Sequence, residues 1–262
     1  MEIILDNVSY SSNKLEESLN SINYTFKNSI TFVSGLRASI IKELLFQEKK
    51  SNKGYVYLSS RASIYDVAYL NNNPTFNNNS LYEEMSYLNK LYKLNYSDFD
   101  KRVNDALKMA NLSLDYLSKT FDKMSINELK KSKLAVALFL NPKIIILDYF
   151  EKNMSNKEIE YLKKLVNKLN KMYNKNIIIF SNDIEVFINI IKDIIIFNSG
   201  NIVFNGTSKD LYNKELYKYI DEPNIISIIN YLNSKKHKFD KYIDIKELLK
   251  AIYRDVENKW DI

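Results

Sequence analysis

The sequence has no cysteine and only one histidine among its 262 residues. The absence of cysteine excludes disulfide bonds and thiolate metal sites, and one histidine leaves little for a histidine-based metal site or a catalytic triad. That histidine, His237, stands in the run Lys-Lys-His-Lys, so we expect a solvated surface side chain. No apolar run reaches the roughly 18 to 20 residues that a membrane-spanning helix needs. Met1 leads into a strand pattern instead of a signal peptide, and we therefore expect a cytosolic chain.

A hydrophobic content of 45% is typical of a globular protein with one large core, or with one core and a smaller appendage. The formal net charge of +6 raises the question of an anionic partner. The lysines, however, are scattered over helix-like segments and alternate with acidic residues, as in residues 156–164. This pattern favours solvated helix faces over a nucleic-acid site, and a location beside anionic lipid would fit the excess equally well.

The most informative stretch runs from Met124 to Phe150 and combines a helix pattern with a buried-strand pattern. One helix face carries apolar residues, namely Leu134, Ala135, Leu138 and Phe139. The lysines of this segment are expected in solvent, namely Lys130, Lys131 and Lys133. Asn141 and Pro142 end the helix, and four apolar residues then lead to Asp148. A continuous apolar run that ends in a carboxylate predicts a central parallel strand, at whose end α/β proteins place their ligands.

A second informative stretch follows the short apolar run Ile30–Gly35 and begins a helical pattern. Strand, glycine turn and helix form the layout of a phosphate-binding loop. The pattern G-x-x-x-x-G-K-[ST] can be laid on this loop without a gap, over Gly35, Leu36, Arg37, Ala38, Ser39, Ile40, Ile41 and Lys42. Ile40 then replaces a glycine that needs φ > 0, and Ile41 brings no charge to a phosphate. Lys42 falls one residue late, about 100° around the helix.

The remaining elements alternate between strand and helix patterns. Strands are expected at residues 2–10, 21–26, 54–60, 66–74 and 176–183. Residues 193–207 read as two strands around a Ser-Gly turn that close with an Asn-Gly turn. Helices are expected at residues 81–94, 98–112 and 156–173 and in the tail from Lys209 to Ile262.

This order of elements resembles the ATP-binding cassette (ABC) ATPases. The stretch from Met124 to Glu128 takes the place of the family's Leu-Ser-Gly-Gly-Gln signature and keeps Ser125. Asp148 takes the place of the Walker B aspartate, but the catalytic glutamate that follows it in the family is Tyr149 here. Other positions differ too: Asn72 for the Q-loop glutamine, Asn182 for the switch histidine, and Ser12, with Tyr10 nearby, for the adenine-stacking aromatic.

The resemblance implies an α/β fold, a P-loop NTPase-like ABC cassette with an antiparallel β subdomain. It implies a core at 1–75 and 124–208, a helical subdomain at 76–123 and a C-terminal dimerisation-like helical domain at 209–262. The tail resembles that of energy-coupling factor (ECF) transporter ATPases. A helical insertion with a solvated face and a generic two-helix cap remain alternatives for the last two parts.

The cofactor that the resemblance implies is ATP with Mg²⁺, the metal being held by Asp148. Losing one charge-stabilising contact typically costs roughly a hundredfold to a thousandfold in rate. Because the lysine, the metal-binding hydroxyl and the base are all replaced, the resemblance favours a pseudo-ATPase over an active enzyme. The alternative is an ATP-binding subunit with weak residual nucleotide binding or hydrolysis that energises solute uptake.

The partners that the resemblance implies are a second cassette, in a homo- or heterodimer, and the transmembrane coupling subunit of a transporter. The chain would then be cytoplasmic and peripheral on the inner face of the cell membrane. A nucleic-acid role is disfavoured, because nucleic-acid-associated cassette proteins usually carry tandem cassettes or long coiled coils, and neither pattern occurs here.

Overall fold

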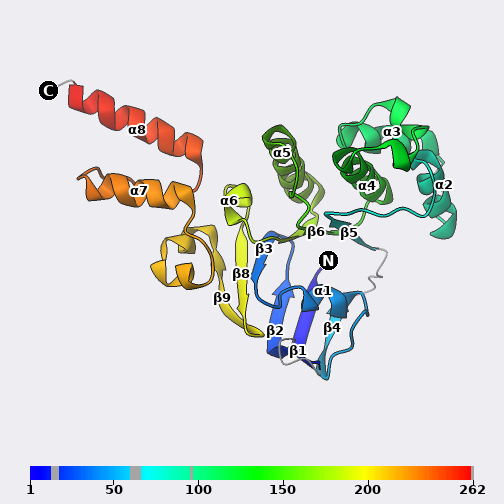
Figure 1. The fold of residues 1–262 in the computed structure, drawn as a ribbon, viewed down its shortest axis with the longest axis horizontal. Coiled ribbons are helices and arrows are strands. Elements are labelled where there is room, and N and C mark those ends of the chain that lie inside the picture. Colours follow the sequence, from blue (N-terminus) through cyan, green and yellow to red (C-terminus); the bar gives the residue numbers. More distant parts are fainter. Residues whose placement is uncertain (13–17, 60–65, 95–96, 261–262) are drawn as a thin grey trace. The chain divides into compact units, whose positions relative to one another are not determined.

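The computed structural model describes residues 1–12, 18–59, 66–94 and 97–260 (Figure 1). The chain divides into two compact units. Unit 1 comprises Met1–Ile3, Phe26–Asn28 and Leu58–Ile179, and unit 2 comprises Ile4–Thr25, Ser29–Tyr57 and Phe180–Ile262.

Unit 1 is built on three neighbouring strands, β5 (Val67–Asn71), β6 (Ile144–Asp148) and β7 (Asn176–Phe180). Strands β5 and β6 are parallel and in register from the Val67 and Ile144 pair to the Asn71 and Asp148 pair. The apolar residues of β6 and all of β7 are buried. Continuous burial explains why these strands show an unbroken apolar run in place of an alternating pattern.

Four helices complete unit 1: α2 (Leu81–Leu91), α3 (Phe99–Met109), α4 (Ile126–Leu140) and α5 (Asn156–Tyr173). Two short 3₁₀ turns lie before α4, at Leu114–Leu117 and Phe121–Lys123. Helix α4 packs against α2 and α3, as Figure 1 shows in green. It begins at the N-cap Ser125 and ends at Asn141, whose backbone is left-handed. Pro142 follows, which agrees with the expected helix end.

The expectation that Lys130 faces solvent is wrong, because this side chain is fully buried. Its ammonium donates to the carbonyl of Phe150 at 3.0 Å and to the carbonyl of Lys152. Burial lowers the pKa of Lys130, although the nearby carboxylates of Glu151 and Glu158 oppose this. Lys131 and Lys133 are only half-buried. Residues on the face of α4 opposite Leu134 are also buried. The amphipathic pattern therefore predicted a smaller buried surface for this helix than the structure has.

Unit 2 contains two groups of strands. The first has the order β2 (Ser18–Phe26), β1 (Ile3–Ser11), β4 (Lys53–Leu58). In the second, β3 (Ile30–Gly35) pairs in parallel with β8 (Asp193–Asn198), and β8 pairs antiparallel with β9 (Asn201–Thr207). Two short helices, α1 (Ile40–Leu45) and α6 (Ile184–Phe187), follow β3 and β7 respectively.

The β8–β9 hairpin confirms one expected turn and corrects the other. Ser199 and Gly200 both have positive φ, 47° and 80°, as a tight hairpin turn requires. Asn205 and Gly206, in contrast, lie inside β9, where Gly206 pairs with Ile194. The Asn-Gly pair therefore forms no turn, because its strand continues to Thr207.

The end of unit 2 is helical, with α7 (Asn224–Ser234) and α8 (Ile245–Trp260) after two 3₁₀ turns at Ser208–Tyr212 and Lys214–Lys218. On α8 an apolar stripe is exposed to solvent, formed by Ile245, Leu249, Tyr253 and Val256. We call it the α8 stripe. His237 is not simply solvated, as we expected, because its Nδ1 lies 2.6 Å from the Asp255 carboxylate and its ring stacks on Phe239. No helix in the described part of the chain is both long and apolar enough to cross a membrane.

Candidate functional site

The loop between β3 and α1 begins with a glycine that the fold requires. Gly35 has φ of 99°, and a Cβ built on it would lie 1.9 Å from the carbonyl oxygen of Phe197 on β8. A side chain at this position would therefore clash with backbone as well as strain the dihedral angle. Close packing of β3 on β8 is enough to explain Gly35, without a bound phosphate.

Three backbone N–H groups of this loop bond to carbonyls of the loop itself. Ile40 N donates to Arg37 O at 3.2 Å and Ile41 N to Ala38 O at 3.2 Å. Ala38 N donates more weakly to Gly35 O at 3.4 Å. A phosphate-binding loop needs several N–H groups directed at one anion. In this loop those donors satisfy carbonyl groups of the chain.

The side chains at the positions of the second glycine and the lysine belong to the hydrophobic core. Ile40 is 3% exposed and Ile41 is 2% exposed, and both lie in the first turn of α1. Lys42 is half-buried, and its Nζ lies 5.2 Å from the centroid of the buried Phe180 ring. Substitution by isoleucine has therefore converted the loop into an apolar anchor for α1.

The other side chains of the loop are arranged around this anchor. Arg37 has φ of 76°, and its guanidinium donates to the Ser18 hydroxyl on β2 at 2.7 Å. Leu36 and Ser39 are exposed and Ala38 is buried. On β1, the ring of Tyr10 lies under Lys49, with Nζ 5.1 Å from its centroid.

In unit 1 the predicted Walker B position stands at the end of β6. Asp148 is opposite Asn71 of β5, and its Oδ2 accepts a hydrogen bond from the Tyr69 hydroxyl. Tyr149 follows with φ of 49°, an uncommon conformation for a non-glycine residue. Lys152 Nζ lies 4.2 Å from the centroid of the Tyr149 ring. At the position predicted for the catalytic carboxylate, the structure thus places a phenol ring beside a cation.

The amides at the predicted Q-loop and switch positions are placed differently. Asn72 follows the end of β5, and its Oδ1 is buried and accepts no hydrogen bond from any residue that the structure describes. Asn182 is exposed in the turn after β7. The preceding Ser181 is buried, and its N–H donates to Val33 O of β3 at 3.2 Å. The side chain of Asn72 is one methylene shorter than the glutamine expected at its position. Asn182 has no imidazole, which the histidine expected at its position would supply.

The predicted signature residues form the start of α4. Ser125 is its N-cap, and the Ser125 hydroxyl accepts from Glu128 N at 3.4 Å and donates to Glu128 Oε2 at 3.0 Å. Glu128 also accepts from Lys119 at 2.8 Å and from Tyr116 at 2.5 Å. Hydrogen bonds from Lys119, Tyr116 and Ser125 lower the pKa of Glu128 to about 2, so this carboxylate is anionic at neutral pH.

This capping box, which sequence reasoning did not use, gives the signature segment a different role. A Ser-x-x-Glu pattern before a helix is a recognised signal in a sequence. Ile126, at the first of the two glycine positions, is 38% exposed. Asn127, at the second, donates to Glu158 at 3.3 Å. The segment therefore starts a helix through a capping box in which Glu128 is paired with Lys119, where the family has a glycine-rich segment.

The residues present do not fit Mg²⁺-ATP chemistry of the usual kind. A lysine occupies the position of the metal-binding hydroxyl, and isoleucine occupies that of the phosphate-binding lysine. Among the described residues, no group of three or more His, Cys, Asp or Glu side chains is placed to hold a metal ion. The predicted roles of the individual site residues stay predictions.

Comparison with known proteins gives a consistent answer for the fold. No family model matches the sequence. The chain is 24% identical over 257 residues to the sulfate/thiosulfate import ATP-binding protein CysA of Mesostigma viride, covering 93% of this chain and 70% of that protein.

Two solved structures are similar in fold. One is cbiO1 of Clostridium perfringens, described as part of the ABC transporter complex cbiONQ, with a TM-score of 0.67 and 17% identity over 87% of this chain and 98% of that one. The other is the dimeric bacterial ABC transporter cassette MJ0796, with a TM-score of 0.66 and 21% identity over 79% of this chain and 98% of that one. The fold class predicted from the sequence is confirmed. This chain has the fold of an ABC transporter ATP-binding cassette.

Proposed function

We propose that this chain is a degenerate ABC-type ATP-binding subunit, a pseudo-ATPase that serves as a structural or regulatory component of an ECF-like membrane transporter. The observation that carries the proposal is the burial of Ile40 and Ile41, at 3% and 2% exposure, where a nucleotide-hydrolysing cassette needs a glycine and a lysine. A loop with Ile40 and Ile41 in the core, and with three of its N–H groups bonded to its own carbonyls, offers little to a triphosphate.

The signature segment supports the same conclusion. The Ser125 hydroxyl donates to Glu128, whose carboxylate is also paired with Lys119 at 2.8 Å. A hydroxyl that is already bonded to this carboxylate is not available to donate to a phosphate. Pairing with an intact cassette is therefore expected not to restore normal turnover, because this chain alters both its Walker A segment and its signature.

The expected magnitude of the loss supports the absence of useful hydrolysis. Each contact of this kind is worth roughly two to three orders of magnitude in rate. The chain replaces the lysine, the metal-binding hydroxyl and the base at Ile41, Lys42 and Tyr149. Such effects are not fully additive, but the loss of two such contacts would already be expected to lower turnover by several orders of magnitude.

The partners, the location and the division of the chain belong to the same proposal. Of the two similar structures, cbiO1 is part of a transporter complex and MJ0796 is a dimer. By analogy we propose a second cassette and a transmembrane coupling subunit as partners, at the cytoplasmic face of the membrane, with no nucleic acid. Residues 1–75 and 124–208 would form the core, 76–123 the helical subdomain and 209–262 the dimerisation-like domain.

The second candidate is a subunit that still binds nucleotide weakly. It is favoured by Asp148, which keeps the Walker B position at the carboxyl end of β6. In this case ATP and Mg²⁺ would bind without the phosphate lysine, and occupancy would act as a signal.

Calorimetric titration of the full chain with ATP and Mg²⁺, together with an ATPase assay and a thermal shift, tests both candidates. We expect no turnover above background and no difference between the wild type and Asp148→Asn. Micromolar binding without turnover would support the second candidate. Turnover at ordinary ABC rates that Asp148→Asn abolishes would refute the pseudo-ATPase proposal.

A further inference from the structure

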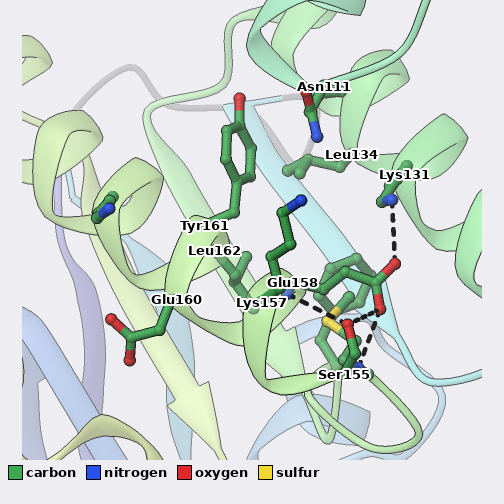
Figure 2. A pocket seen from close by; sticks show the side chains of 13 residues that line it. Asn111, Lys131, Leu134, Ser155, Lys157, Glu158, Glu160, Tyr161 and Leu162 are labelled. Carbon is green, nitrogen blue, oxygen red and sulfur yellow. Dashed lines mark hydrogen bonds and ion pairs between the residues drawn. The ribbon is translucent and has the colours of Figure 1, made fainter.

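Unit 1 contains a cavity of about 490 Å³ whose lining includes none of the predicted nucleotide-motif residues. Residues from four segments line it: the end of α3, the middle of α4, the loop after β6 and the first three turns of α5 (Figure 2). A cavity of this size is within the range of sites for small molecules, ~300 to 1,000 Å³. The question is which class of molecule its walls would accept.

The inner wall of the cavity is apolar. Leu134 of α4, Phe150 after β6 and Leu162 of α5 line it, and all three belong to the buried core. Met154, which is half-buried, closes one side. Such a surface favours an aliphatic or aromatic body, because burying it removes apolar area from water.

Polar groups surround this wall, and most of them are already engaged. The Tyr161 hydroxyl donates to Met109 O at 2.8 Å, which holds its ring at the edge of the cavity. Glu158 accepts from Ser155 N at 2.9 Å and forms an ion pair with Lys131 at 3.0 Å. Burial acts to raise the pKa of Glu158, but these contacts outweigh it and the pKa is lowered. This carboxylate is therefore anionic and neutralised.

Lys157 differs from these groups. Figure 2 shows its ammonium extending from α5 toward Leu134 and the amide of Asn111, whereas the Glu160 carboxylate points away. Within the described part of the chain, Lys157 forms no ion pair. Three lysines and two glutamates line the cavity, and the Lys131–Glu158 pair accounts for one of each. A cation beside an apolar wall, with an amide next to it, is complementary to an anionic group on an apolar body.

We propose that this cavity binds a small amphipathic anion, with its acyl or aryl body on Leu134, Phe150 and Leu162 and its carboxylate or similar acidic group at Lys157 and Asn111. Lys157 supplies charge and the Asn111 side chain supplies an N–H donor. Such a ligand would also contact Met154, which belongs to the loop that follows β6. The proposal does not depend on whether the chain binds nucleotide.

The test is calorimetry of the full chain with decanoate below its micellar concentration, compared with 1-decanol, which has the same chain length and no charge. A charge-assisted hydrogen bond contributes enough for about a tenfold difference in affinity. We therefore expect decanoate to bind at least about tenfold more tightly than decanol. We expect this preference to weaken as salt is added.

Two variants locate the site, and a third is the control. Lys157→Met keeps most of the aliphatic stem and removes the charge. Asn111→Asp changes the amide to a carboxylate at a left-handed position, φ 57°, that aspartate tolerates. Each is expected to weaken decanoate binding about tenfold or more. Lys171→Met, on an exposed position of the same helix away from the cavity, is expected to change nothing.

Three results would overturn the proposal. They are no decanoate binding at millimolar concentration, equal affinity for decanol, and variants at Lys157 and Asn111 that bind as the Lys171 control does. Circular dichroism shows whether each variant is folded, and because Lys157 is exposed we expect no loss of stability in Lys157→Met.

Discussion

Restoring the lysine of the phosphate-binding pattern by Ile41→Lys tests whether this loop is a damaged nucleotide site or part of the core. Ile41 is 2% exposed and lies among the buried residues of α1. Removing its buried side chain costs about 1.5 to 3 kcal/mol. The ammonium must then reach water or lose its proton at neutral pH, and deprotonation alone costs about 5 kcal/mol.

We therefore expect Ile41→Lys to lower the free energy of unfolding by about 2 to 8 kcal/mol, the lower value applying if the side chain bends toward solvent. That is a large part of the ~5 to 15 kcal/mol that holds a typical domain together. Urea unfolding followed by circular dichroism measures it. Ile41→Met is the matched control, because a volume-conserving apolar exchange usually costs less than about 1.5 kcal/mol.

The result that would refute this reasoning is a variant Ile41→Lys that is as stable as Ile41→Met and binds ATP with Mg²⁺ at micromolar concentration. Such a variant would show that the loop can open toward a phosphate with little energetic cost. The proposal of a pseudo-ATPase would then lose the observation on which it rests.

Three other predictions follow from contacts described above. Lys130→Met leaves the buried carbonyl of Phe150 and the part-buried carbonyl of Lys152 without this donor. It is expected to cost about 1 to 3 kcal/mol, against under about 1 kcal/mol for the half-exposed Lys131→Met, both by urea unfolding. The pKa of Glu128, about 2 in the folded chain against an ordinary 4.5, means that its contribution is present at neutral pH and is lost as pH falls from 4.5 toward 2. With Glu128 about a quarter exposed, we expect the wild type to lose about 1 to 2 kcal/mol more than Glu128→Gln over that range in acid titration of stability, and equal losses would contradict the contacts of Glu128. Charging the α8 stripe with Leu249→Asp and Tyr253→Asp is expected to shift sedimentation toward monomer without changing the helical circular dichroism signal. An unchanged assembly state, or a loss of helical signal, would argue against this helix face as a contact between cassettes.

The elements that the sequence predicted well are those whose pattern is imposed by burial. Strand β3 and helix α5 have the expected bounds, Ile30–Gly35 and Asn156–Tyr173. The runs of β6 and β7 are apolar because both faces of these strands are covered. For such elements local composition and tertiary environment agree, and the pattern is sufficient.

The errors arose where a distant partner decides the environment of a residue. Lys130 looked like a surface lysine, but carbonyls twenty or more residues away bind its ammonium. The pair of His237 and Asp255 is separated by 18 residues, and Gly206 is held in a strand by Ile194. None of these contacts can be predicted from the residues that are adjacent in the sequence.

The candidate site was also predicted only in part. Sequence reasoning found which residues stand at the motif positions, and it foresaw that Ile40 avoids positive φ. It did not foresee that the loop N–H groups bind carbonyls or that Ser125 and Glu128 form a closed pair. Each donor has several possible acceptors in the folded chain, and the spacing of residues in the sequence does not predict which acceptor it binds.

The starts of α4 and α5 carry the same capping box, Ser125 with Glu128 and Ser155 with Glu158. Glu158 also accepts from Asn127 and pairs with Lys131, both residues of α4. One carboxylate thus holds the first turns of two helices, so fraying of α5 releases the beginning of α4 as well. In hydrogen exchange, the amide protons of the two first turns should open together as a single cooperative unit.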